Sequence, residues 1–261
     1  MSDGHSTSAG NALREAQKLR ETGVPSIVVT VIDGRNAGSR LLISESVTNG
    51  TLGDPKLDET ARALAAERLE SGTSGLATIG DNIKVFVDVV LPKPLLVLVG
   101  AVHVAQAVTP LAQTLGYRVA VVDARETLAN ADRFPTVDQI LVAWPDDAYP
   151  QLPITSSSAI VILTHDPKFD EPAIVGAVAT AAGYIGAVGS RKTIADRQVR
   201  LVEAGLTEDQ LGRVYGPIGL NIGGSSPEEM ALSILAEVVA VRNGRPAGFL
   251  RDGRGSVRSG G

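Results

Sequence analysis

Three glycine-bearing segments in the second half of the sequence could bind an anionic ligand. In the first, an apolar run at 95–99 leads into a turn and then a predicted helix. A strand, a glycine turn and a helix in this order can bind the pyrophosphate of a dinucleotide. Asp123 ends the next apolar run, about 20 residues on, where a carboxylate can bond a ribose hydroxyl. The candidate residues of the turn are Gly100, Val102 and His103.

This first segment departs from the dinucleotide-binding pattern at its central position. Val102 stands where a glycine would let the backbone approach a pyrophosphate, so its β-branched side chain is expected to crowd that place. A turn that binds nothing is therefore an open alternative. His103 could be a general acid or base, or a hydrogen-bonded structural residue. Asp123 favours NAD over NADP, but Arg125 two residues on makes this preference ambiguous.

The second segment, at 183–193, combines a glycine loop with cations. Ser190 is a predicted N-cap, and the amides and dipole of the following helix favour an anion beside Arg191 and Lys192. Arg197, one to two turns on, could join them. The binding residues predicted here are Gly186, Gly189, Ser190, Arg191, Lys192 and Arg197. The alternative is a solvated basic helix start that binds nothing.

The third segment is a loop at 216–226 that is rich in glycine and ends in a helix start at Ser226. Its candidate binding residues are Gly219, Asn221 and Gly223, although the loop could equally be only a helix entry. His165 and Asp166 follow another predicted strand, so they are expected at the same sheet edge as the glycine loops.

Composition excludes several kinds of chemistry. The 261 residues include no cysteine, which excludes disulfides, thiolate metal sites and a cysteine nucleophile. Three scattered histidines do not suggest a zinc site, and no catalytic residue is assigned. A net charge of −5 argues against nucleic acid or a lipid surface as partner. No signal-peptide or membrane-spanning pattern is found, so a cytoplasmic location is expected.

These residues must be positioned by two different units. Segment 1–10 is expected to be a flexible tail, and 11–91 a small α+β domain. After the Pro92-Lys93-Pro94 linker, apolar strands alternate with helices up to residue 244, and 245–261 is expected to be a second flexible tail. The predicted fold is therefore α/β, with a Rossmann-like parallel sheet and helices on both faces at 92–244, preceded by the α+β domain. The predicted strands are 26–32, 40–45, 83–90, 95–99, 118–123, 139–143, 159–163 and 184–188, and the predicted helices 11–22, 58–70, 102–115, 171–182, 193–204 and 227–243.

The sequence resembles the XdhC/CoxI family, accessory proteins of xanthine dehydrogenase and CO dehydrogenase. The resemblance rests on the turn at 100–105 with the strand and Arg-Phe-Pro ending that follow it, on 184–206, and on 216–244. The first 90 residues resemble a shortened form of the family's N-terminal domain. The family's glycine-cysteine stretch is without its thiol here, because 50–55 reads Gly-Thr-Leu-Gly-Asp-Pro.

The resemblance implies a protein that binds molybdopterin or molybdopterin dinucleotide and delivers it to an apo molybdenum hydroxylase. Without cysteine, the chain cannot carry a persulfide, so a sulfur donor would be a separate protein. A homodimer would cover the sheet of the reduced N-terminal domain. The alternatives are an NAD(P)-binding oxidoreductase and a non-catalytic module that senses a nucleotide.

Overall fold

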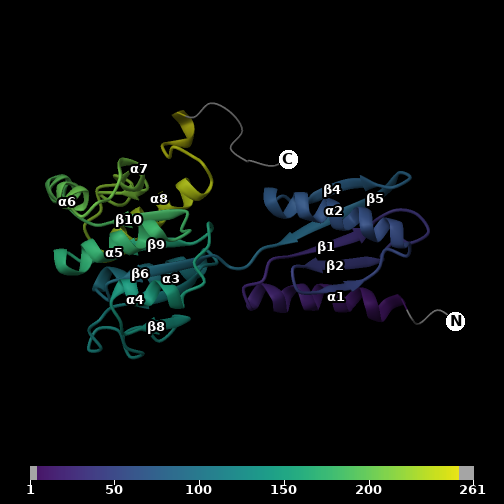
Figure 1. Cartoon of the computed structure of the whole chain (residues 1–261), viewed down its shortest axis with the longest axis horizontal. Coiled ribbons are helices and arrows are strands. Elements are labelled where there is room, and N and C mark those ends of the chain that lie inside the picture. Colours follow the sequence, from purple (N-terminus) through teal and green to yellow (C-terminus); the bar gives the residue numbers. More distant parts are fainter. Residues whose placement is uncertain (1–4, 253–261) are drawn as a thin grey trace. The chain divides into compact units, whose positions relative to one another are not determined.

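The computed structural model describes residues 5–252, and the chain divides into two compact units, Met1–Lys93 and Pro94–Gly261 (Figure 1). The division falls in the segment 91–94, which forms neither helix nor strand. Each unit has its own sheet and its own hydrophobic core.

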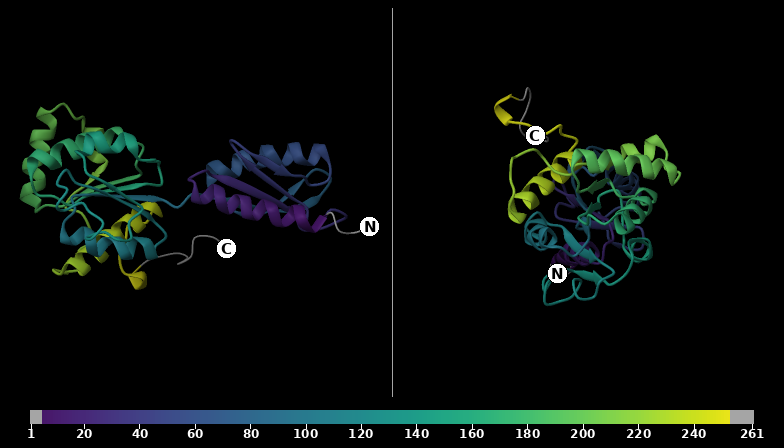
Figure 2. Two further views of the ribbon diagram at one scale, coloured as in Figure 1. Left: turned by 90° about the horizontal axis from the view of Figure 1, so that it is seen from below. Right: turned by 90° about the vertical axis from the view of Figure 1, so that its left-hand side faces the viewer.

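The first unit is a five-stranded antiparallel sheet with a helix on each face (Figure 2). Its elements are α1 (His5–Glu21), β1 (Ser26–Val31), β2 (Arg40–Ser44), β3 (Thr48–Gly50), α2 (Pro55–Ser71), β4 (Gly75–Ile79) and β5 (Ile83–Val90). The strand order is β3-β2-β1-β5-β4. Because side chains alternate along a strand, Ile27 and Val29 of β1 pack with α2, whereas Val28 packs with α1 on the other face.

The second unit is a six-stranded sheet in which every pairing is parallel. Its elements are β6 (Leu95–Val99), α3 (His103–Thr114), β7 (Arg118–Val122), β8 (Gln139–Leu141), α4 (Pro145–Ala148), a 3₁₀ turn (Tyr149–Gln151), β9 (Ala159–Ile162), α5 (Pro167–Ala179), β10 (Tyr184–Ala187), α6 (Arg191–Glu203), α7 (Glu208–Gly212), β11 (Val214–Tyr215), α8 (Pro227–Arg242) and a 3₁₀ turn (Leu250–Asp252). The strand order is β11-β10-β9-β6-β7-β8, which is the order of the dinucleotide-binding Rossmann fold when β6 is counted as the first strand. The predicted α/β class with a Rossmann-like sheet is confirmed.

Both faces of this parallel sheet are buried. Leu96 and Leu98 of β6 pack into a core with α3 and α8, and Val97 and Val99 pack into a second core with α5 and α6. No residue of β6 is more than 5% exposed. Burying one leucine or valine side chain stabilises a protein by about 1.5–3 kcal/mol. A strand made of a continuous apolar run, such as β6, is therefore favoured in the middle of the sheet, where both faces are buried.

Several short elements differ from the prediction. The strands β3, β4 and β11 and the helices α4 and α7 have no counterpart among the predicted elements, and β3 lies where a loop was expected. Strand β11 has only 2 residues. Strand β4 lies at a sheet edge and leaves Leu76 68% exposed, so its apolar pattern is weak.

Four helices, α1, α2, α5 and α6, begin earlier than predicted. Helix α5 begins at Pro167 because Asp166 caps it, accepting the amide of Lys168 at 3.0 Å, and proline suits the first helical position. Helix α1 begins at His5, inside the segment expected to be a tail. Residues 1–4 and 253–261 lie outside the described residues.

Candidate functional site

The predicted binding segments lie at one edge of the parallel sheet. Because parallel strands end at the same edge, the residues that follow β6, β7, β9, β10 and β11 are all found there. From β6 the chain continues to β7 on one side, whereas β9 pairs with β6 on the other side. This reversal is the topological switch point at which doubly wound sheets bind ligands.

A cavity of about 240 Å³ lies at this switch point. We call it the switch-point cavity. It has aromatic, cationic and anionic side chains in its wall, and is lined by Val102, Ala124, Arg125, Trp144, Leu163, Thr164, His165, Asp166 and Phe169.

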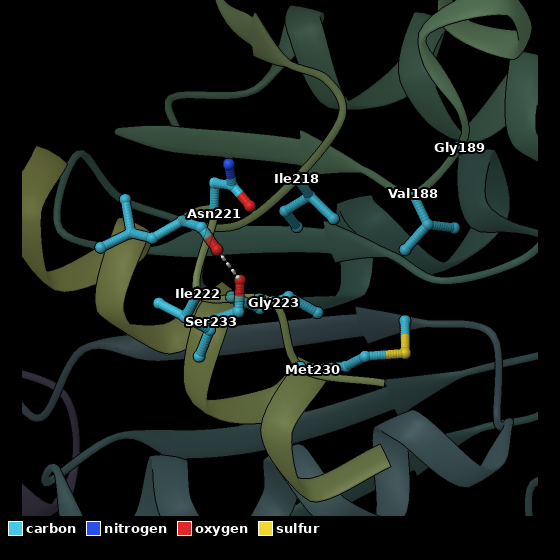
Figure 3. Close-up of a pocket in the computed structure, with 11 residues that line it drawn as sticks. Val188, Gly189, Ile218, Asn221, Ile222, Gly223, Met230 and Ser233 are labelled. Carbon is cyan, nitrogen blue, oxygen red and sulfur yellow. Dashed lines mark hydrogen bonds between the residues drawn. The ribbon is translucent and has the colours of Figure 1, made fainter. Parts of the chain in front are cut away.

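A second cavity of about 290 Å³ lies between the β10–α6 loop, the loop at 216–224 and helix α8 (Figure 3). We call it the glycine-loop cavity. It is lined by Val188, Gly189, Ile218, Leu220, Asn221, Ile222, Gly223, Gly224, Met230, Ser233 and Ile234. The predicted segments thus share an edge but divide between two cavities: the first contributes Val102 and Arg125 to one, and the second and third contribute to the other.

The turn after β6 needs glycine at its first position. Gly100 has a φ of +103°, and a side chain on it would collide with Cγ2 of Thr164. Its amide donates to the carbonyl of Val122 at 2.8 Å, and the next amide, of Ala101, donates to Oδ2 of Asp123 at 2.8 Å. The turn is therefore fixed to the end of β7.

The carboxylate of Asp123, which was predicted to bond a ribose hydroxyl, is bonded to protein groups in the structure. Its side chain is fully buried, and besides the amide of Ala101 it accepts the Nε and Nη2 of Arg125, both at 2.8 Å. Burial acts to raise the pKa of Asp123, but hydrogen bonds from Arg125 and from the amide of Ala101 outweigh it and hold the pKa below its usual range. The hydrogen-bonding positions of this carboxylate are therefore occupied by protein groups.

Arg125 remains accessible although it is paired with Asp123. Its side chain is 56% exposed and lines the switch-point cavity. The hydrogen bond to Asp123 raises the pKa of Arg125, and the carboxylate of Asp166 in the same cavity adds to the shift. Arg125 and Asp166 thus present opposite charges to one cavity.

Helix α3 begins without a side-chain cap. Val102 is its N-cap residue and is half-buried in the wall of the switch-point cavity, whereas His103 is exposed. Arg133, which was not predicted from the sequence to belong here, donates from Nη2 to the carbonyl of Ala101 at 3.1 Å and to Oε1 of Gln106 at 3.2 Å. The Arg-Phe-Pro ending was the signal that could have placed it beside the turn.

The second segment is only partly arranged as predicted. Ser190 caps α6, accepting the amide of Thr193 at 3.0 Å, and Gly189 has a φ of +151°. Arg191 and Lys192 are exposed on the first turn of α6 and line neither cavity. Gly186 lies inside β10, where a side chain would come within 2.6 Å of Ile218 and of the Tyr184 hydroxyl, so packing explains this glycine.

Arg197, which was predicted to contact an anion, is buried and bonded to protein groups. It is 4% exposed, and it donates to Oδ2 of Asp170 at 2.8 Å and to the carbonyl of Val188 at 3.1 Å. Thr164 donates to the other oxygen of Asp170. Burial raises the pKa of Asp170 to about 6, against the opposing effect of Arg197. These side chains connect Thr164 in one cavity wall to Val188 in the other.

The third segment is held by helix α8. Gly219, with a φ of +100°, donates its amide to Oε2 of Glu237 at 3.0 Å. The hydroxyl of Ser233 donates to the carbonyl of Leu220 at 2.6 Å, the bond drawn in Figure 3. Asn221 and Gly223 are exposed and line the glycine-loop cavity.

The described part of the chain forms neither a metal cluster nor a membrane span. Among residues 5–252, no group of three or more His, Cys, Asp or Glu side chains is placed to hold a metal ion. Across the same described stretch, no helix has the length and apolar character needed to span a membrane.

Two family models match the sequence. Residues 96–238 match the XdhC Rossmann domain, and residues 19–80 match the XdhC and CoxI family. The first match alone covers more than half of the chain, and it contains every residue that lines the two cavities.

Three curated relatives align over most of the chain. It is 29% identical to uncharacterized protein YqeB of Escherichia coli K12 over 260 residues, which cover 92% of the chain and 48% of YqeB. It is 28% identical to a probable xanthine dehydrogenase subunit of Bacillus subtilis 168, covering 88% of the chain and 65% of that protein. It is 24% identical to the molybdenum cofactor insertion chaperone PaoD of E. coli K12, covering 93% of the chain and 90% of PaoD. The chain thus spans about half of the first relative and 65% of the second.

A crystal structure of a xanthine dehydrogenase from Bacillus halodurans shares the fold. The two structures match with a TM-score of 0.56 at 19% sequence identity, and the match covers 89% of this chain and 94% of the B. halodurans chain.

Proposed function

The chain belongs to the XdhC and CoxI family, and from this premise we propose that it is a maturation chaperone that binds the molybdenum cofactor for a molybdenum hydroxylase. Its cargo would be molybdopterin or molybdopterin dinucleotide. Its client would be an apoenzyme of the xanthine dehydrogenase or CO dehydrogenase type. The names of PaoD and of the B. subtilis relative support this role.

The observation that carries the proposal is the pair of cavities at one edge of the family's Rossmann sheet. A ligand with a flat ring and a phosphate needs an apolar wall and hydrogen-bond donors near each other. The switch-point cavity supplies aromatic rings and the cation of Arg125. Near the glycine-loop cavity, the first turn of α6 carries amides that have no acceptor within the helix, together with Arg191 and Lys192.

The residue types fit the cargo but not a role in its sulfur chemistry. The chain has no cysteine, so it cannot bind molybdenum through a thiolate or carry a persulfide. The metal would stay on the sulfur atoms of the pterin, and a separate donor protein would supply any terminal sulfur. The protein's contribution would be to bind the organic part and its phosphate and to release both to the client.

The Rossmann strand order favours a second candidate, NAD(P) binding. The occupied carboxylate of Asp123 argues against it, because the group that would bond the ribose is saturated by Ala101 and Arg125. The two candidates differ in ligand preference.

Cofactor transfer tests the proposed function. The chain is loaded with the complete molybdenum cofactor, which is molybdopterin with bound molybdenum and its terminal sulfur, separated from free cofactor by gel filtration, and mixed with cofactor-free xanthine dehydrogenase. We expect the chain to retain the pterin and to activate the apoenzyme faster than free cofactor does. An unrelated Rossmann protein is the control. Failure to accelerate activation, with or without retention of the pterin, would contradict the proposal.

A further inference from the structure

One wall of the switch-point cavity is aromatic. Trp144 and Phe169 pack against each other with ring centroids 5.2 Å apart and ring planes inclined by 39°. Phe169 is buried, whereas Trp144 is 48% exposed. Trp144 directly precedes Pro145 and is the N-cap residue of α4, so its backbone is restricted. A partly exposed indole in a cavity wall offers a face on which a flat ring can stack.

The same cavity carries one anion and one cation near this aromatic wall. Asp166 is exposed, and its Oδ1 accepts the amide of Lys168, which leaves Oδ2 available to a ligand. Arg125 uses Nε and Nη2 on Asp123, so its Nη1 can donate outward. A ring that carries N–H donors next to a carbonyl could bond both side chains at once.

We propose that the switch-point cavity recognises the 2-amino-4-oxo-pyrimidine edge of a flat heteroaromatic ring, stacked on Trp144, with Asp166 accepting its N–H groups and Arg125 donating to its carbonyl. The inference rests on the proposed function, which makes the pterin of the cofactor the ring concerned. Guanine carries the same edge, whereas cytosine and adenine do not. Lumazine is the pterin ring with a second oxygen in place of the amino group.

The tryptophan makes a direct test possible, because Trp144 is the only tryptophan of the chain. The full chain is titrated with pterin, lumazine, GMP and CMP while the fluorescence of Trp144 is recorded. We expect saturable quenching by pterin, with energy transfer to pterin emission. We expect lumazine and CMP to bind at least about tenfold more weakly, the size of effect typical of one lost charge-assisted bond. Tight GMP binding with weak pterin binding would overturn the assignment to the pterin and give the site to a nucleotide.

Asp166→Asn tests the carboxylate without removing the helix cap, since asparagine caps helices as well as aspartate does. We expect it to lose at least about tenfold in pterin affinity and to lose the preference for pterin over lumazine. Asp147→Asn, on an exposed carboxylate that lines neither cavity, is the matched control and should bind as the wild type does. Thermal unfolding of each variant checks that the fold is retained.

Equal binding of pterin, lumazine and CMP, or an unchanged Asp166→Asn variant, would overturn the inference. Cofactor transfer to the apoenzyme is measured separately. Intact transfer by an Asp166→Asn variant would therefore reject this ring site alone. Selective pterin binding without any transfer would reject the proposed function instead.

Discussion

At the scale of single residues, the structure separates groups that hold the site from groups that can reach a ligand. Asp123, Gly186 and Arg197 were all predicted to bind the ligand, yet each is buried and explained by its protein neighbours. Arg125 and Asn221 line cavities. Residue type and spacing locate the sheet edge, but they do not tell which side chains turn inward.

Arg191 and Lys192 are predicted to contribute to phosphate binding. The double variant Arg191→Ala with Lys192→Ala should weaken the affinity for a phosphate-bearing ligand by about 2 kcal/mol or more, because two charge-assisted contacts are lost. Calorimetric titration measures this change. Arg245→Ala, which removes a cation beyond the end of α8, is the control. An unchanged affinity in the double variant would show that the first turn of α6 is not the phosphate site.

Gly100 is predicted to be needed for both its backbone conformation and its lack of a side chain. Gly116 also has a positive φ, of +85°, but no atom within 4 Å of where a side chain would begin. Gly116→Ala should therefore cost about 1–2 kcal/mol of unfolding free energy from backbone strain. Gly100→Ala should cost about 1–3 kcal/mol more, because the methyl group collides with Thr164. Urea unfolding of both variants would contradict this explanation if the two costs were equal.

At the scale of elements, loops at the sheet edge are positioned by the helices that follow them. Helix α8 holds the loop at 216–224 through Glu237 and Ser233. Helices α5 and α6 supply the buried pair of Asp170 and Arg197, which fixes the end of β10 through Val188. The walls of the two cavities are therefore connected through packed side chains, and the loops that form them are not positioned independently.

Asp170 predicts a specific pH dependence of stability. Its pKa of about 6 in the folded state lies above the value of about 3.9 in an unfolded chain, so the folded state binds the proton more tightly. Its contribution to stability is present below about pH 4 and is lost as the pH rises through about 6. Asp170→Asn removes this dependence. The unfolding free energy of the variant minus that of the wild type should therefore increase as the pH rises from about 4 to about 7. If this difference in unfolding free energy stays constant or decreases as the pH rises, Arg197 keeps Asp170 ionised.

The elements differ in how well sequence predicts them, for physical reasons. The central strands of the parallel sheet are buried on both faces, and their continuous apolar runs are recognisable. The edge strands β3 and β11 have only 3 and 2 residues, too few for a pattern. The cavities were not predictable, because Trp144, Asp166 and Arg125 meet only through the sheet topology. Asp166 was nevertheless expected at the correct edge, since it directly follows a recognisable strand.

At the scale of the whole molecule, the chain consists of two units with separate cores. In the first unit β1 contributes to the core, and in the second unit β6 contributes to the cores on both faces of the sheet. Both cavities are lined entirely by residues of the second unit. The proposed ligand binding therefore involves the second unit, and no residue of the first unit lines either cavity.

The second unit is predicted to fold and bind by itself. A chain of residues 94–261 should unfold cooperatively and keep the ligand affinity of the full chain, because its core and both cavities are complete. A chain of residues 101–261 is the control, and it should not fold because it lacks the central strand β6. Scanning calorimetry and ligand titration measure both properties. Loss of binding in the 94–261 chain would mean that the first unit completes the site.

The most direct test of the central claim, that this sheet edge binds a phosphate-bearing pterin, is one calorimetric comparison. The full chain is titrated with molybdopterin, molybdopterin cytosine dinucleotide, NAD and ATP under the same conditions. We predict that at least one pterin cofactor binds at least about tenfold more tightly than NAD or ATP, a difference of about 1.4 kcal/mol. Tight binding of NAD with no binding of either pterin would contradict the account.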